Sequence, residues 1–282
     1  MKEIGDKSGE SKCYTGLGTG YYCLGDFKKA VEYHEKSLKI MKEIGDKSGE
    51  SACYGNLGIA YNCLGDFRKE VEYHEKSLKI MKEIRDKSGE SKCYINLGNA
   101  YNCLGDFKKA VEYLEKSLKI GDKSGESKCY INLGNAYYCL GDFKKAVEYH
   151  EKSLKIMKEI WDKSGESKCY AGLGIAYWGL GDFKKAVEYL ESSLKIMKDI
   201  GDRYYEILVH LNIGLLFAGK EQERAEKEGE EAKKLIKELE IENFPSGRKF
   251  LEIAGKIISG DLSEKEKRDI GEYLSKVMVQ KM

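Results

Sequence analysis

Asparagine recurs at fixed places in this chain and is the residue type most suited to binding a ligand. A carboxamide both donates and accepts hydrogen bonds, so a row of carboxamides suits the N–H and C=O groups of a peptide backbone. Asn is disfavoured inside helices because its side chain competes for backbone hydrogen bonds, so its repeated use needs a reason. The alternative reason is structural, with the carboxamides capping or bridging neighbouring helices. The candidate residues are Asn56, Asn62, Asn96, Asn99, Asn102, Asn132 and Asn135.

Lysine and two aromatic residues accompany this pattern. Lysines recur four residues before the first asparagine position, and they would attract an acidic peptide or a terminal carboxylate. The alternative is that they are ordinary solvated lysines in the first turns of helices. Tyr138 and Trp178 take the place of Asn62 and Asn102, and an exposed aromatic residue there would anchor a ligand. The lysines are Lys12, Lys92, Lys128 and Lys168.

Cysteine occurs mostly in pairs ten residues apart, such as Cys93 and Cys103. Ten residues of helix span about 15 Å, so neither a disulfide nor a shared metal fits within a pair. No C-x-x-C spacing is present, which argues against zinc. We therefore expect buried packing thiols, no metal site, and a reducing, cytoplasmic location.

Histidine shows no catalytic pattern. His34, His74 and His150 stand at a position that other repeats fill with Leu114 and Leu190, and exchange with leucine indicates packing. No nucleophile and base recur or cluster in the sequence. We therefore expect no catalytic residues, no cofactor and no enzymatic activity.

The overall charge argues against two classes of function. The 282 residues carry 49 Lys and Arg against 48 Asp and Glu, a net charge of +1, whereas nucleic-acid binders usually carry excess positive charge. No apolar stretch reaches the length of a membrane span, and the first residues contain no secretory signal. We expect neither a nucleic-acid partner nor a membrane.

A repeated segment organises the chain. The sequence Asp-Lys-Ser-Gly-Glu-Ser begins at residues 6, 46, 86, 122 and 162, and a weaker copy begins at 202. One step is 36 residues instead of 40, because Met-Lys-Glu-Ile is missing after Ile120. Four residues are close to one helical turn, so the apolar phase nearly survives and we expect the stacking to continue.

Each repeat predicts two helices. In the third, Asp86 suits a helix N-cap and Gly105 a helix end, and Asp106 then caps a second helix. Apolar residues at helical spacing form one stripe on each helix, and one pair cannot bury these stripes alone. Stacked copies bury them against their neighbours, which predicts a solenoid.

The third repeat resembles the tetratricopeptide repeat family. The residues that carry the resemblance are Tyr94, Leu97, Gly98, Tyr101, Gly105, Phe107, Ala110 and Leu118, and the other copies repeat them over about residues 1–240. The 40-residue period and Leu97-Gly98-Asn99 resemble the Leu-Gly-Asn subgroup. The resemblance implies an all-α, right-handed superhelical α-solenoid of helix-turn-helix units, with the first helices lining a concave groove. Glu70 departs from the pattern, because it replaces the small Ala.

The chain divides into a repeat array, residues 1–242, and C-terminal capping helices, residues 243–282. Asn243 to Gly247 interrupt the repeat, and Ser263 with Glu266 forms a capping box before the last helix. Its apolar stripe needs a surface to cover. We expect these helices to pack on the open end of the sixth repeat, and the rival position is inside the concave face, with Lys281 or Met282 near the asparagines.

These features favour a non-catalytic scaffold that binds an extended or helical peptide, preferentially an acidic one, in its concave groove. The alternatives are a helical repeat that binds single-stranded RNA, and the sensing arm of a larger signalling protein. The first residues, Met1 to Ile4, match Met41 to Ile44, so the chain starts inside a repeat. We therefore also expect end-to-end self-association through the uncapped first repeat.

Overall fold

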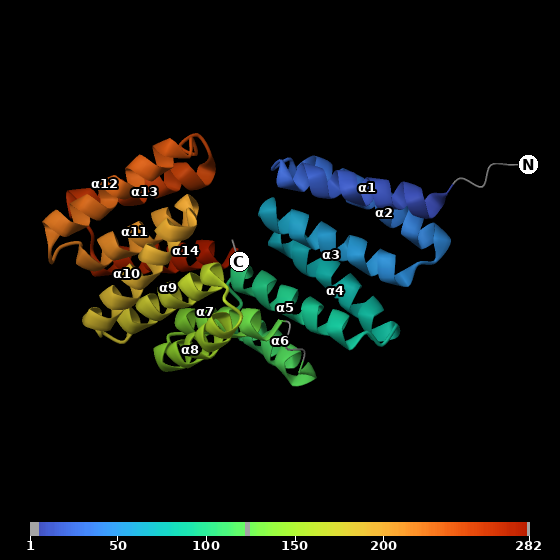
Figure 1. Ribbon diagram of the computed structural model, residues 1–282, viewed down its shortest axis with the longest axis horizontal. Helices are drawn as coiled ribbons and strands as arrows, with labels where there is room; N and C mark the ends of the chain where they lie inside the picture. The colour runs from blue at the N-terminus through green and yellow to red at the C-terminus, as the bar shows by residue number, and fades with distance from the viewer. Residues whose placement is uncertain (1–5, 122–124, 281–282) are drawn as a thin grey trace, which may run out of the picture. The chain divides into compact units, whose positions relative to one another are not determined.

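The computed structural model describes residues 6–121 and 125–280, without the side chains of 275, 276 and 278–280. Fourteen helices occupy these ranges, and no strand occurs in them (Figure 1). This confirms the all-α fold predicted from the repeats. The helices are α1 (Lys7–Cys23), α2 (Phe27–Ile44), α3 (Lys47–Cys63), α4 (Phe67–Glu83), α5 (Lys87–Leu104), α6 (Phe107–Ile120), α7 (Glu126–Cys139), α8 (Phe143–Glu159), α9 (Lys163–Gly179), α10 (Phe183–Ile200), α11 (Arg203–Phe217), α12 (Gln222–Glu238), α13 (Pro245–Ser259) and α14 (Glu264–Gln280).

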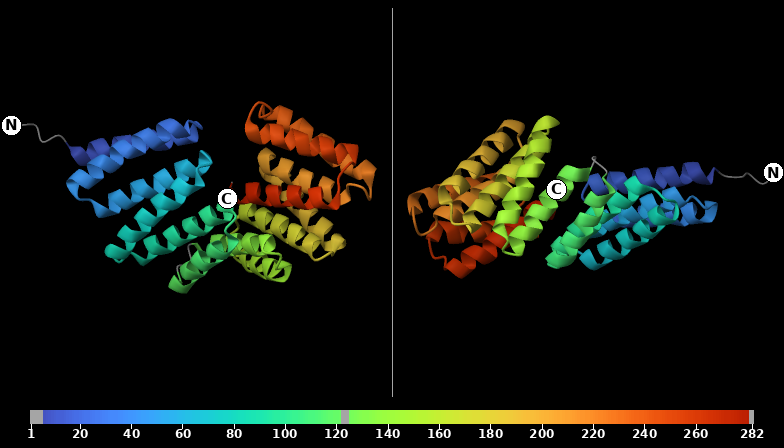
Figure 2. Two further views of the ribbon diagram at one scale, coloured as in Figure 1. Left: turned by 180° about the vertical axis from the view of Figure 1, so that it is seen from behind. Right: turned by 90° about the horizontal axis from the view of Figure 1, so that it is seen from below.

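Helices that follow one another along the chain pack side by side. α1 packs on α2, α3 on α4 and α5 on α6, and the same holds for α9 with α10 and α11 with α12. Within each unit, second helices also contact the next first helix, as α2 does with α3, α4 with α5 and α8 with α9. Figure 2 shows the pairs α1–α2 and α3–α4 from two further sides, in blue and cyan. The apolar stripes are thereby buried between neighbouring repeats, as expected for a solenoid.

The chain forms two compact units, residues 1–129 and 130–282, which divide inside α7. The division follows the missing Met-Lys-Glu-Ile, which shortens α6 to 14 residues, against 17 in α4 and α8. The start of the fourth repeat, expected near residue 122, lies outside the described residues. α7 begins at Glu126.

Aspartate begins the helices and glycine ends several of them, as predicted. The Oδ1 atom of Asp86 accepts a hydrogen bond of 2.9 Å from the backbone N–H of Gly89. Asp106 accepts one of 3.2 Å from the backbone N–H of Lys109. Gly105 follows α5 with φ of 79°, the left-handed conformation that an L side chain disfavours.

The glycine of each Leu-Gly pair lies directly against the second helix of its repeat. A Cβ atom added to Gly98 would stand 2.5 Å from Leu114 Cγ, and one added to Gly134 would stand 2.6 Å from His150 Nε2. Gly58 meets His74 at 2.6 Å in the same way. Histidine and leucine therefore fill the same space, which confirms that these histidines are packing residues.

This contact predicts opposite effects for two glycine substitutions in unit 1. Gly98→Ala should lower the free energy of unfolding by about 1 to 2 kcal/mol, because crowding of Leu114 outweighs the higher helix propensity of alanine. Gly55→Ala should raise it by about 0.5 to 1 kcal/mol, because nothing lies within 4 Å of the new Cβ atom. Urea unfolding followed by circular dichroism checks both, and shifts of the same sign would contradict the contact.

Serine and cysteine side chains join successive helices. Ser51 Oγ lies 2.7 Å from Ser77 Oγ, and Ser77 Oγ lies 3.3 Å from Cys93 Sγ, which links α3, α4 and α5. Burial raises the pKa of the Cys93 thiol, so it stays protonated and unreactive. The expectation of buried thiols is correct for Cys53, Cys93, Cys129 and Cys169.

The same expectation is wrong for the other five cysteines. Cys13, Cys23 and Cys63 are exposed, and Cys103 and Cys139 are half-buried. In α3, the side that carries Cys53 is covered by α2, the second helix of the preceding repeat. Cys13 lies on the same side of α1, where no described helix packs, and is therefore exposed. Leu17, on the same side, is 47% exposed, whereas its counterpart Leu57 is fully buried.

The two C-terminal helices take different positions. α13 packs against α12 and α11, where the first helix of a further repeat would lie, and it buries Phe250, Ile253 and Ile257. α14 packs instead against α11 and α9. The sequence placed both helices on the sixth repeat, and both contact it: α13 packs on α12 and α11, whereas α14 packs on α11 and also reaches α9 of the fifth repeat.

Candidate functional site

In unit 1, four asparagines of first helices keep part of their surface accessible, Asn62 among them. Asn56 of α3 and Asn96 and Asn99 of α5 are half-buried. The Oδ1 atom of Asn99 is buried and has no hydrogen-bond partner among the described residues. A buried acceptor without a partner costs free energy, so a rotation of the carboxamide that brings this oxygen to the accessible part of Asn99 would favour a ligand N–H.

Asn62 has a structural role instead. Its Nδ2 atom donates a hydrogen bond of 2.9 Å to Glu70 Oε2 and lies 4.0 Å from Cys103 Sγ. Glu70 is only 2% exposed, and burial raises the pKa of its carboxyl group to about 7. Asn62 thus partners the buried carboxyl group that replaces the usual alanine, as the bridging alternative predicted.

Three further candidate asparagines are buried. Asn102 is 4% exposed, Asn132 is 6% exposed and Asn135 is 9% exposed. The Nδ2 atom of Asn135 lacks a hydrogen-bond partner among the described residues. The sequence predicted one accessible row of asparagines. In the structure, Asn56, Asn96 and Asn99 are partly accessible and have no side-chain hydrogen bond like the one from Asn62 to Glu70.

The position of Asn96 lies partly against the scaffold, although Asn96 keeps part of its surface accessible. In α9 the same position is Gly172, and a Cβ atom there would stand 2.4 Å from the His150 ring of α8. This position therefore faces the second helix of the preceding repeat. The spacing of asparagines alone did not show this, because it does not tell which neighbour each side of a helix meets.

The candidate lysines likewise differ in how far they are exposed. Lys92 and Lys128 are exposed in unit 1, as is Lys12. Lys168 in unit 2 is half-buried, and its Nζ atom lies 5.1 Å from the ring centre of Tyr205 in a cation–π contact. Lys168 thus contacts the next first helix of the array, while the other lysines face solvent.

The two aromatic candidates lie beneath the chain's own last helix. Tyr138 and Trp178 are half-buried and pack into the large core cluster of unit 2, which includes Ile270 and Leu274 of α14. A Cβ atom on Gly271 of α14 would stand 3.3 Å from Trp178 Cζ3 and 3.7 Å from Tyr138 Oη. The residues expected to be open anchors are therefore already in contact with a helix.

Outside these candidates, Glu70 and His74 form a pair of buried titratable groups on α4. His74 Nε2 lies 3.9 Å from Glu70 Oε1, and burial lowers the pKa of His74 to about 4. Glutamate at an alanine position was the sequence signal for this pair. Within the described part of the chain, no group of three His, Cys, Asp or Glu side chains is placed to hold a metal ion.

The tetratricopeptide repeat family matches four overlapping segments, residues 10–83, 71–123, 94–159 and 129–199. Together they cover residues 10–199, well over half of the 282 residues. The chain belongs to the tetratricopeptide repeat family.

Solved structures share this fold. BtubC (BKLC) from P. vanneervenii is 26% identical with a TM-score of 0.60, covering 67% of this chain and 80% of that one. RapI in its apo form is 17% identical with a TM-score of 0.71, covering 93% and 99%. A Rap protein complexed with competence and sporulation factor is 17% identical with a TM-score of 0.67, covering 89% and 76%. The last two likenesses show the fold alone.

No curated protein matches the sequence. None of the described helices is both long and apolar enough to cross a membrane.

Proposed function

We propose that this chain is a non-catalytic scaffold that binds a peptide on the first helices of its repeats. Membership of the tetratricopeptide repeat family supports a role in protein interaction. A Rap protein of the same fold was solved as a complex with competence and sporulation factor, which supports ligand binding by such a solenoid. We also propose that the chain belongs to the Leu-Gly-Asn subgroup, because of its 40-residue repeat period, and that it is cytoplasmic, because it has an odd number of cysteines.

The observation that carries the proposal is the arrangement on α5. Asn96 and Asn99 are one turn apart and partly open, and Asn99 holds a buried oxygen without a partner among the described residues. A peptide N–H that meets this oxygen after the Asn99 carboxamide rotates would replace an unsatisfied acceptor with a hydrogen bond. Exposed Lys92 stands one turn before Asn96, so an acidic residue in the peptide would add a favourable charge interaction.

The test is a selection of random 15-residue peptides displayed on phage against the intact chain. We expect enrichment of acidic peptides, and weakening of their binding by about tenfold or more in the double variant Asn96→Ala with Asn99→Ala, because two hydrogen bonds are lost. Asn132 and Asn135 are left unchanged because their burial would confuse binding with folding.

The matched control is Lys79→Ala with Lys108→Ala, two exposed residues of second helices. This variant should bind the selected peptides as the unmodified chain does, and both variants should unfold at similar urea concentrations. Equal peptide affinity of the asparagine variant and the control would reject the role of α5, and so would a selection that enriches no peptide.

The rival functions gain less support. The first-turn lysines that an RNA binder would use are in part neutralised, as Lys47 pairs with Glu50 at 3.0 Å and Lys87 with Glu90 at 2.7 Å. A sensing arm of a larger signalling protein would use the same peptide-binding face and stays a proposal. End-to-end self-association also stays a proposal: α1 has an exposed side, but α13 already covers α12 at the other end of the array.

A further inference from the structure

The end of the repeat array is already closed before the last helix begins. α13 packs on α12 and α11, and its Phe250 and Ile257 are completely buried. A solenoid needs such an element because its last repeat would otherwise expose an apolar face. α14 is therefore not required as a cap, and its position needs another explanation.

α14 leaves the repeat arrangement. The second helix of a repeat packs beside its own first helix, so a helix that continued the array would lie on α13. α14 instead lies against α11 and α9, which are both first helices. It buries Ile270, Leu274 and Val277 there, one stripe at spacings of four and three residues.

The contact with Trp178 and Tyr138 is built for close approach. Gly271 lies next to Ile270 of the stripe, and its missing side chain leaves room for the ring of Trp178. Burial raises the pKa of Tyr138, and the nearby Glu272 of α14 acts in the same direction. The two aromatic residues stand at the position that other first helices fill with Asn62 and Asn102, and in unit 2 α14 covers this position from the side of the first helices.

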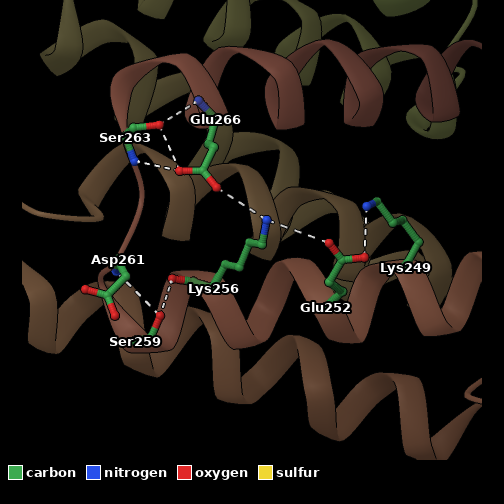
Figure 3. A network of polar contacts seen from close by, with 7 residues as sticks. All are labelled: Lys249, Glu252, Lys256, Ser259, Asp261, Ser263 and Glu266. Atoms are coloured by element: carbon green, nitrogen blue, oxygen red, sulfur yellow. Dashed lines mark hydrogen bonds and ion pairs between the residues drawn. The ribbon is translucent and has the colours of Figure 1, made fainter.

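A short polar hinge connects α14 to α13, as Figure 3 shows. The capping box predicted from the sequence is present: the Ser263 backbone N–H donates to Glu266 Oε2 at 3.0 Å, and the Glu266 N–H donates to Ser263 Oγ at 3.2 Å. Lys256 of α13 joins Glu266 at 3.4 Å. Gly260 between the helices has φ of 73°. These contacts keep the start of α14 at the end of α13 while the rest of the helix is held by its apolar stripe.

We propose that α14 is a tethered internal ligand, which occupies the first-helix face of unit 2 until an amphipathic helix of a partner displaces it. The partner helix has the chemistry that α14 displays: a glycine or alanine that faces Trp178, beside an apolar stripe like that of Ile270, Leu274 and Val277. This deepens the proposed scaffold function and rests on it, because it specifies a helical ligand and its regulation for unit 2.

Trp178 provides the readout, because the chain has only two tryptophans and Trp161 is 82% exposed. In a full-length Trp161→Phe background, Leu274→Asp places a charge in the stripe of α14 and should release the helix. We expect acrylamide to quench Trp178 at least about twofold more strongly in this variant. The matched control is Arg268→Asp, which adds the same side chain at an exposed position of α14 and should leave the quenching unchanged.

The probe for displacement is a synthetic peptide of residues 261–280. A tethered helix acts at an effective concentration near about 1 mM, so the peptide should bind the Leu274→Asp chain at least about tenfold more tightly than the Arg268→Asp chain. Its binding should restore the protection of Trp178, and the same peptide carrying Leu274→Asp should not. Equal quenching in the two chains, or no restoration by the peptide, would overturn the proposal.

Hydrogen exchange of the unmodified chain tests whether α14 can be displaced, even if the Leu274→Asp variant fails to fold. A displaceable α14 opens alone, so its amides should exchange at least about tenfold faster than those of α11. Equal exchange would show that α14 leaves only when the unit unfolds, and would overturn the proposal. These outcomes are independent of α5. The affinity of the Asn96 and Asn99 variant for the phage-selected peptides tests the scaffold function in unit 1. The quenching of Trp178 and the hydrogen exchange of α14 test only the internal ligand in unit 2.

Discussion

Glu70→Gln should stabilise the chain at about pH 8 by up to about 3 kcal/mol, and the gain should vanish near pH 5. The carboxyl group is 2% exposed in α4, and burial raises its pKa to about 7 although the hydrogen bond from Asn62 opposes the shift. A folded pKa above the unfolded value means that the folded state binds more protons between the two values. The folded state therefore gains stability as the pH falls through 7 and carries a buried charge above it.

Glutamine has the shape of glutamate and keeps an oxygen that accepts from Asn62, so the substitution removes the charge alone. Urea unfolding at the two pH values measures the effect, and Glu72→Gln, exposed on the same helix, is the control without a pH-dependent gain. The same change in stability at both pH values would contradict the burial of an ionised Glu70.

Local features of the fold could be predicted from the sequence because they depend on neighbours along the chain. Asp86 and Gly105 mark helix ends through their own backbone conformation and hydrogen bonds, and the exchange of His150 with Leu114 revealed a packing position. The 36-residue step similarly located the short helix α6.

The position of α14 could not be predicted in this way. Its stripe of Ile270, Leu274 and Val277 fits any apolar surface of suitable width, and the choice between α12 and the face of α9 and α11 depends on what α13 already covers. The asparagines pose the same problem. Spacing places Asn62 and Asn102 alike, but Asn62 meets Glu70 of the following helix, and the repeat of Asn102 carries Ala110 at that place.

Acid should destabilise the chain through its buried histidines, and His150→Leu should remove part of this effect. Burial lowers the pKa of His150 to about 4, since this residue is only 1% exposed and its ring lies against Gly134 and Gly172. The unfolded chain takes up a proton near pH 6.5 and the folded chain only near pH 4, so stability falls as the pH drops through this window.

His150→Leu should therefore match the unmodified chain at about pH 7.5 and exceed it by about 2 to 3 kcal/mol at about pH 4.5. Leucine suits the site because Leu114 and Leu190 fill the same place against Gly98 and Gly174. The reciprocal variant, Leu114→His, should introduce the acid sensitivity that His150→Leu removes, which separates protonation from a general change in packing. Urea unfolding over the pH range checks both variants. If His150→Leu leaves the pH profile unchanged, the imidazole must take up its proton in the folded chain as easily as in the unfolded chain. That result would contradict a ring buried between the two glycines.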